Sequence, residues 1–163
     1  AGAQLVVTDI HEDRIARVVE NFGARVVKPD DIYSVDCDVF APCALGAGLN
    51  SRTIPTLRCK VVAGAANNQL ATPDVAEILR GRGVVYAPDY CVNAGGLIQV
   101  ADELDPSGFR FERAEQRAAG IEATTYAVLE AAAHDAVSPA VAADRLAERR
   151  IRSVGRLRGL WLG

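Results

Sequence analysis

The residues best suited to bind a small polar ligand lie at positions 60–70, KVVAGAANNQL. An apolar run that predicts a buried strand ends here in four small residues, and three amide side chains follow. The small residues at 63–66 leave room for a planar ring to approach the backbone, and Asn67 offers two donors and an acceptor. Alternatively, Asn67 and Asn68 bond to their own backbone in a turn. The residues alone leave both interpretations open.

A second candidate is the acid that ends the first predicted strand. Asp9 could accept hydrogen bonds from the ribose hydroxyls of an adenosine, and its charge would repel a 2′-phosphate. It could equally cap the helix predicted over residues 11–22. Arg14, one turn inside that helix, could reach the same ribose or face water.

A third block, residues 93–100, reads NAGGLIQV. Asn93 could cap a helix, and the glycines give the backbone room. Leu97 and Val100 are spaced to share one helix face, as ordinary core or as the wall of a substrate pocket.

The remaining polar residues indicate no catalytic pair. The acidic cluster of Asp102, Glu103 and Asp105 predicts solvated surface, and neither His11 nor His134 has an acid–nucleophile partner nearby in sequence that would make it catalytic. The four cysteines form no CxxC pair, which predicts reduced thiols in a cytoplasmic protein and no metal site.

The composition is that of one globular domain. The chain has 163 residues, 50% of them hydrophobic, and a net charge of −3. This charge indicates neither a nucleic-acid partner nor a membrane surface. No uncharged apolar run approaches the roughly 20 residues of a membrane span.

Elements that could position these residues alternate along the chain. Strands are predicted at 4–9, 24–27, 38–41, 61–63 and 84–87, and helices at 11–22, 51–57, 72–80, 94–104, 110–134 and 141–154. Thr72 is the expected cap of its helix, which should end at Gly81. This alternation predicts a parallel α/β sheet, in which ligands bind at the carboxyl ends of the strands. The basic tail at 155–163 predicts a frayed or partner-docked end.

Several blocks together carry a family resemblance. VVTD (6–9), DVFAPCALGA (38–47), KVVAGAANNQL (60–70), VVYAPDYCVNAGGLIQVADEL (84–104) and AADRLAERRI (142–151) resemble the C-terminal cofactor domain of the amino-acid dehydrogenases. The match is to the leucine/valine branch, and it runs over nearly the whole chain.

The resemblance implies NAD-dependent oxidative deamination of a branched-chain L-amino acid to a 2-oxo acid and ammonia. By matching position, the cofactor-binding residues are Asp9, Arg14, Cys43, Ala44, Ala65, Ala66 and Asn67, and the substrate-binding residues are Asn67, Leu97 and Val100. A leucine at position 97, bulkier than valine, favours a smaller substrate such as valine. The resemblance also implies a homo-oligomer.

The resemblance leaves out several parts of the family's machinery. The family's catalytic lysine belongs to an N-terminal domain, and neither Lys28 nor Lys60 matches a catalytic position. No glycine-rich phosphate loop precedes Asp9, so the expected fold is a Rossmann-like doubly wound parallel sheet that lacks its first strand and is followed by C-terminal helices. The missing strand is central, which predicts two half-sheets with unpaired edges.

We therefore expect a fragment that is inactive as an isolated polypeptide, with an incomplete dinucleotide-binding domain at 1–140 and a C-terminal helix and basic tail at 141–163. The alternative is a non-catalytic nucleotide-binding or interaction module derived from such an enzyme.

Overall fold

The structure is a computed structural model that describes residues 2–158, with side chains up to residue 155. Its elements follow the order β1 (Val6–Val7), α1 (Glu12–Phe22), β2 (Arg25–Val26), η1 (Ile32–Ser34), β3 (Val39–Phe40), η2 (Ile54–Thr56), β4 (Val61–Val62), α2 (Val75–Gly81), β5 (Val85–Tyr86), α3 (Asp89–Val92), α4 (Gly95–Glu103), α5 (Phe111–Asp135) and α6 (Pro139–Arg158). The prediction of a frayed tail at 155–163 falls mostly outside the described side chains.

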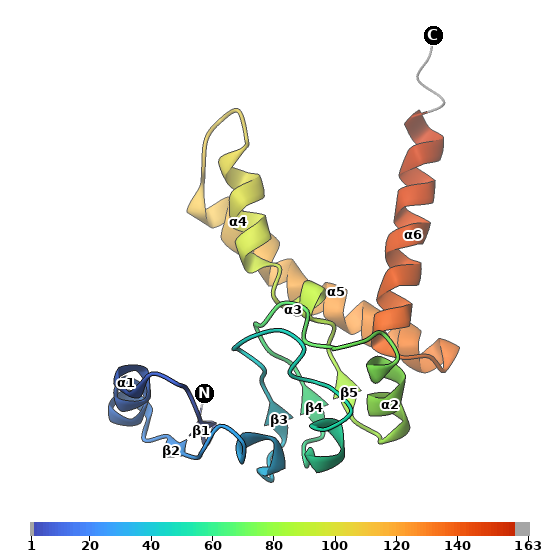
Figure 1. Ribbon diagram of the computed structural model, residues 1–163. Helices are drawn as coiled ribbons and strands as arrows, with labels where there is room; N and C mark the ends of the chain where they lie inside the picture. The colour runs from blue at the N-terminus through green and yellow to red at the C-terminus, as the bar shows by residue number, and fades with distance from the viewer. Residues whose placement is uncertain (1, 159–163) are drawn as a thin grey trace.

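The strands form two separate parallel sheets (Figure 1). β1 pairs with β2, and β4 lies between β3 and β5 in the second sheet. In Figure 1 the strands follow one another across the molecule in the order β2, β1, β3, β4, β5, with no pairing between β1 and β3 among the described residues. The expectation of two half-sheets with unpaired edges is therefore confirmed.

The element types expected from the sequence are largely observed, with local differences. Each strand pairs over only two residues, fewer than expected, although flanking bonds such as that from the Val27 N–H to the Val7 carbonyl extend the pairing. The helix expected at 51–57 is the single 3-10 turn η2, because the Asn50 carboxamide accepts the N–H groups of Arg52 and Thr53 and forms its own turn first. The Thr72 cap is wrong, since Asp74 precedes α2 and Thr72 offers only its backbone carbonyl, to the N–H of Val75.

The hydrophobic core lies between the three-stranded sheet, α2 and the η2 segment. Its fully or nearly buried members are Leu49, Ile54, Leu57, Cys59, Val62, Val75, Leu79, Val84 and Tyr86. In contrast, residues 2–27 bury only Ala24, so the β1–α1–β2 unit has little core of its own. The carboxyl ends of β3, β4 and β5 are therefore supported by a well-packed core.

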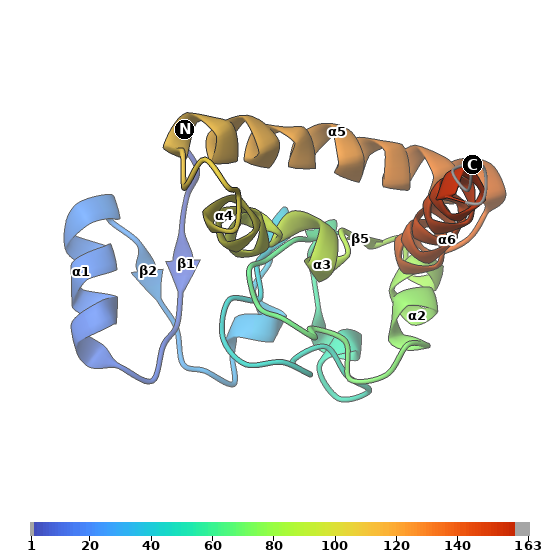
Figure 2. The same cartoon turned by 90° about the horizontal axis from the view of Figure 1, so that it is seen from above.

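The C-terminal helices extend beyond the sheets (Figures 1 and 2). Helix α5 packs against α3, α4 and α6, and Figure 2 shows it running along one side of the molecule. The start of α6 is fastened to α2 where the Ser138 N–H donates to Glu77 Oε1 at 2.8 Å. No helix of residues 2–158 is long and apolar enough to cross a membrane.

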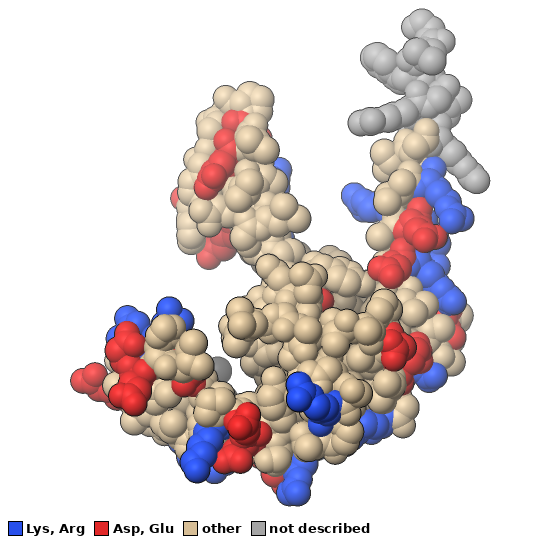
Figure 3. Space-filling view, viewed as in Figure 1, with Lys and Arg blue, Asp and Glu red and all other residues tan. Residues whose placement is uncertain are grey.

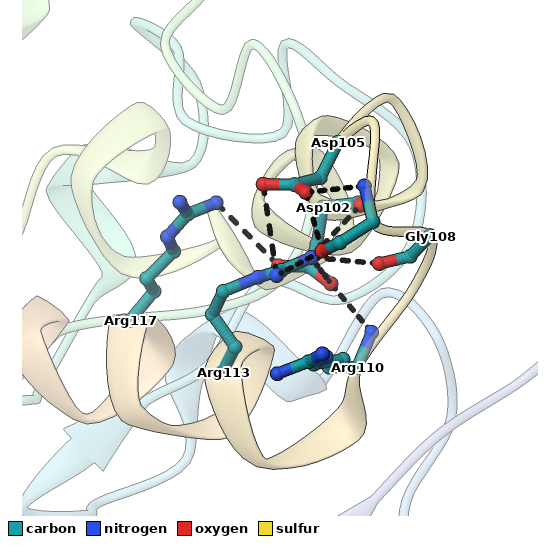
Figure 4. A network of polar contacts seen from close by, with 7 residues as sticks. Asp102, Asp105, Gly108, Arg110, Arg113 and Arg117 are labelled. Atoms are coloured by element: carbon teal, nitrogen blue, oxygen red, sulfur yellow. Dashed lines mark hydrogen bonds and ion pairs between the residues drawn. The ribbon is translucent and has the colours of Figure 1, made fainter.

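Asp102 corrects the prediction of an acidic surface cluster. Its carboxylate is 0% exposed and accepts hydrogen bonds from the Arg110 N–H at 2.7 Å and from Arg113 Nη2 at 3.0 Å (Figure 4). Arg113 Nε also donates to it, and Arg117 lies 3.6 Å away. The acid is buried because the turn between α4 and α5 folds it against two arginines that lie one helical turn apart, a pairing that local sequence does not reveal.

Replacing Asp102 with asparagine should lower the unfolding temperature at neutral pH and weaken its acid dependence. The Arg113 hydrogen bond holds the pKa of the Asp102 carboxyl below its usual range. Its contribution is therefore present above the unfolded pKa of about 4 and is lost as the pH falls through the lower folded pKa. Thermal unfolding of the complete gene product at pH 7 and pH 3 checks this, with the exposed Asp30→Asn as control. An equal difference from wild type at both pH values would contradict the prediction.

Candidate functional site

The residues of the turn after β4 are small because the backbone that follows β3 lies directly beside them. A Cβ atom on Gly64 would lie 2.5 Å from the nitrogen and 2.7 Å from Cδ of Pro42, which follows β3. The Ala66 N–H then donates to the Pro42 carbonyl at 2.9 Å. Close packing of two strand ends thus explains Gly64, and the room that the sequence suggested for a planar ring remains only at the exposed Ala65.

Gln69 holds this turn from the inside. Its side chain is fully buried, and its amide nitrogen donates to the carbonyls of Gly64 at 2.8 Å and Ala66 at 3.0 Å. Its Oε1 atom has no partner among the described residues. The sequence marked Gln69 only as one of three amides, yet it is the one that shapes the loop.

The loop after β3 lies directly beside the loop after β4. A Cβ atom on Gly46 would lie 2.9 Å from the Asn67 carbonyl oxygen, and the Ala47 N–H donates to the Asn68 carbonyl at 2.7 Å. Cys43 and Ala44, both exposed, begin this loop. The structure therefore brings the predicted cofactor contacts of the two loops, 43–44 and 65–67, to one edge of the sheet.

Asn67 is exposed and is oriented by Asn93. The Asn93 amide nitrogen donates to Asn67 Oδ1 at 2.6 Å. The structure gives the Asn67 amide nitrogen no acceptor within residues 2–158, so both of its N–H groups can donate to a ligand. This contact replaces the local turn considered from the sequence, and Asn93 terminates α3 instead of capping α4.

Asp89 is a buried acid beside the Asn67 loop that the sequence analysis did not single out. It opens α3, a four-residue helix hidden from periodicity by its length, and it is buried. Its Oδ2 atom accepts the Asn68 N–H at 2.6 Å, and its Oδ1 atom accepts the Tyr86 hydroxyl at 2.8 Å. Only its position next to Pro88, three residues beyond the end of β5, could have drawn attention to it.

Asp9 and Arg14 lie together after β1, in the other half-sheet. Asp9 Oδ1 accepts the His11 N–H at 2.9 Å, and Oδ2 lies 3.9 Å from Arg14 Nη1. The His11 hydrogen bond and the nearby guanidinium lower the pKa of the Asp9 carboxyl, which stays ionised. One carboxylate oxygen of Asp9 thus binds the backbone at the start of α1, and the other can accept a hydrogen bond from a further donor.

Leu97 and Val100 lie on α4 and are exposed, 73% and 53% respectively. The interpretation of this pair as ordinary core is therefore wrong. Leu104, which follows the last residue of α4, is 81% exposed. An apolar helix face in this position suits a wall for an aliphatic ligand.

The surface above the strands of β3, β4 and β5 is almost free of Lys, Arg, Asp and Glu in the view of Figure 3, whereas charged side chains gather on α1 and along the lower edge. Small and amide side chains line this uncharged surface at the carboxyl ends of the strands. Such an edge can bind a flat, hydrogen-bonding ligand, and the part of the chain that the structure describes places no acid–base pair for proton transfer along it.

Comparison with known proteins identifies relatives of the whole described region. The family model described as glutamate/leucine/phenylalanine/valine dehydrogenase matches residues 3–159. The leucine dehydrogenase of Bacillus cereus is 51% identical over 99% of this chain, and the valine dehydrogenase of Streptomyces albus is 50% identical over 92%. The chain spans 43% and 42% of these two proteins, less than half of each.

Solved structures give the same result. The L-tryptophan dehydrogenase of Nostoc punctiforme superposes with a TM-score of 0.88 at 46% identity, over 92% of this chain and 45% of that one. A hetero-hexameric glutamate dehydrogenase of Thermus thermophilus shares the fold, with a TM-score of 0.65 at 21% identity over 92% of this chain and 38% of that one.

Proposed function

Because this chain belongs to the glutamate/leucine/phenylalanine/valine dehydrogenase family, we propose that it is the cofactor-binding part of an enzyme that oxidatively deaminates a branched-chain L-amino acid with NAD. The observation that carries the proposal is the shared sheet edge, where the loops of Cys43 and Asn67 lie in contact. About 50% identity to both leucine and valine dehydrogenases supports the substrate class.

The residues present fit a dinucleotide. Asp9 keeps one carboxylate oxygen for the adenosine ribose, and Arg14 stands beside it as a second contact. Cys43, Ala44 and Ala65 supply the exposed backbone edge along which the nicotinamide half lies. Ala66, also expected there, is buried, and its N–H is bound to the Pro42 carbonyl, so it shapes this edge from beneath. Asn67 presents two N–H donors, which suit the carboxamide or the substrate carboxylate.

NAD, when bound, supplies the acceptor for the hydride that leaves the substrate α-carbon. The part of the work assigned to this chain is orientation: Asn67 fixes a polar head group, and Leu97 and Val100 enclose the aliphatic side chain. No residue of this chain is assigned the proton transfers that complete the deamination.

The proposal is tested by the complete gene product that contains these residues. Mixed with NAD and L-valine, L-leucine or L-isoleucine, it should reduce NAD, with release of ammonia and the matching 2-oxo acid. Absorbance of the reduced cofactor follows the reaction. Binding of NAD without turnover of any amino acid would instead support the non-catalytic module.

Replacing Leu97 with valine should shift the preference from L-valine toward L-leucine. A smaller side chain at position 97 enlarges the pocket by about one methylene, a difference that changes specificity ratios roughly 10-fold or more. The ratio of kcat/KM for the two amino acids in both proteins checks this. An unchanged ratio would remove position 97 from the pocket. Ile78→Val, which removes one methylene from an exposed residue of α2, provides the control.

Location and assembly belong to the same proposal. The cysteines Cys37, Cys43, Cys59 and Cys91 are free thiols in the structure, which suits the reducing cytoplasm. Self-association into a homo-oligomer and the division of the chain near residue 140 stay predictions.

A further inference from the structure

The loop that carries Asn67 contacts the short helix α3 as well as the loop after β3. The two ends of α3 contact consecutive residues of this loop: Asp89 binds the backbone of Asn68, and Asn93 binds the side chain of Asn67. One oxygen of the buried Asp89 carboxylate accepts the Asn68 N–H of the loop, and the other accepts the Tyr86 hydroxyl of β5. The geometry of the loop is thereby tied to the neighbouring strand.

The contact fixes the backbone at Asn68. Asn68 has a φ of +53°, in the left-handed region, which asparagine adopts more readily than most residues other than glycine. Its N–H meets Asp89 Oδ2 at 2.6 Å, a charge-assisted hydrogen bond. This bond holds the left-handed conformation of Asn68, the residue directly after Asn67.

We propose that Asp89 is a positioning residue, which acts on the ligand of Asn67 by holding the Asn68 N–H and so aiming the Asn67 carboxamide. Asp89 itself touches no ligand in this scheme, because it is buried beneath the loop. The inference rests on the proposed function for its kinetic consequence, but the contact that it describes exists without any ligand.

A second property of the site keeps the Tyr86 hydroxyl protonated at alkaline pH. Burial and the bond to Asp89 raise the pKa of the Tyr86 hydroxyl, so the phenol remains a donor. The Asp89 N–H also donates to the Tyr86 oxygen at 3.3 Å. Tyr86 and Asp89 therefore support each other on the side away from the loop.

The test is a double-mutant cycle in the complete gene product. Asp89→Asn puts an amide in place of the carboxylate and should lower kcat/KM for the amino acid roughly 10- to 100-fold, because the Asn67 amide is misplaced. In the Asn67→Ala background the same change should cost less than about threefold, since the group being aimed is gone. Additive effects would overturn the inference and would indicate a merely structural acid.

Matched variants separate the two bonds of the carboxylate. Tyr86→Phe removes the partner of Oδ1 but leaves the bond to Asn68, so it should lower stability while changing kcat/KM less than Asp89→Asn does. If Asp89→Asn does not fold, Asp89→Glu keeps the charge and moves it by one methylene, and it should show the same dependence on Asn67. A larger kinetic loss for Tyr86→Phe than for the Asp89 variant would contradict the proposal.

Hydrogen exchange gives a readout that needs neither activity nor a variant. In the unmutated protein the Asn68 amide should exchange at least about tenfold more slowly than the neighbouring Asn67 amide, which has no acceptor among the described residues. Equal exchange would overturn the inference. Protection of the Asn68 amide in a protein that turns over no amino acid would refute the proposed function, while the contact between Asp89 and Asn68 would still be supported.

Discussion

Replacing Gly64 with alanine is expected to destabilise the protein by about 3 kcal/mol. The added Cβ would lie 2.5 Å from the Pro42 nitrogen and 2.7 Å from its Cδ. Hydrogen bonds hold both residues in place. The Pro42 carbonyl accepts the Ala66 N–H, and the Gly64 carbonyl accepts the Gln69 side-chain amide. The strand ends of β3 and β4 would have to separate.

Urea unfolding of the complete gene product measures this change. Gly120→Ala is the matched control: Gly120 lies inside α5, its added Cβ would meet nothing within 4 Å, and the substitution should stabilise the helix by about 0.5–1 kcal/mol. If Gly64→Ala unfolds at the same urea concentration as wild type, the close approach of the two loops is not as described.

Replacing Asn67 with alanine should lower kcat/KM for the amino acid about 100-fold while leaving stability almost unchanged. Loss of one well-placed donor typically costs a factor of about 10² to 10³ in an active site. The side chain is exposed, and its only bond among the described residues joins it to Asn93, so little folding energy is at stake.

Asn67→Ala should therefore lower kcat/KM strongly in steady-state kinetics but change the unfolding temperature little. Asn21→Ala provides the control, because Asn21 is an exposed amide that bonds only within its own helix α1. A loss of less than about threefold for Asn67→Ala, or an equal loss for Asn21→Ala, would show that the Asn67 amide contacts no reacting partner.

The sequence predicted the fold class because its signals are local. Apolar runs closed by Pro42 and Pro88, and the helix of α1 closed by Gly23 in the left-handed conformation, are read from a few neighbouring residues. The separation into two half-sheets was predicted from the order of the strands in the resembled family, and the pairing of β1 with β2 alone confirms it.

The site was predicted as a set of residues but not as a geometry. Asn67 and Cys43 were expected at the strand ends, whereas the structure adds the contacts that place them. Gln69 and Asp89 bond to backbone groups, and backbone groups leave no sequence signature. Asp102 was misplaced for the same reason. Its arginine partners lie across a turn, so the sequence alone does not reveal the buried ion pair, and the acid was predicted to lie on the surface.

The claim that a dinucleotide lies along the strand ends from Asp9 to Asn67 is tested most directly by titrating the complete gene product with NADH and with NADPH. Fluorescence of the reduced nicotinamide reports binding. NADH should bind at least about tenfold more tightly, because the ionised Asp9 repels a 2′-phosphate. Asp9→Ser, which keeps an acceptor for the His11 N–H, should narrow that difference about tenfold. Equal affinity for the two cofactors, or a preference that Asp9→Ser leaves unchanged, would contradict the account.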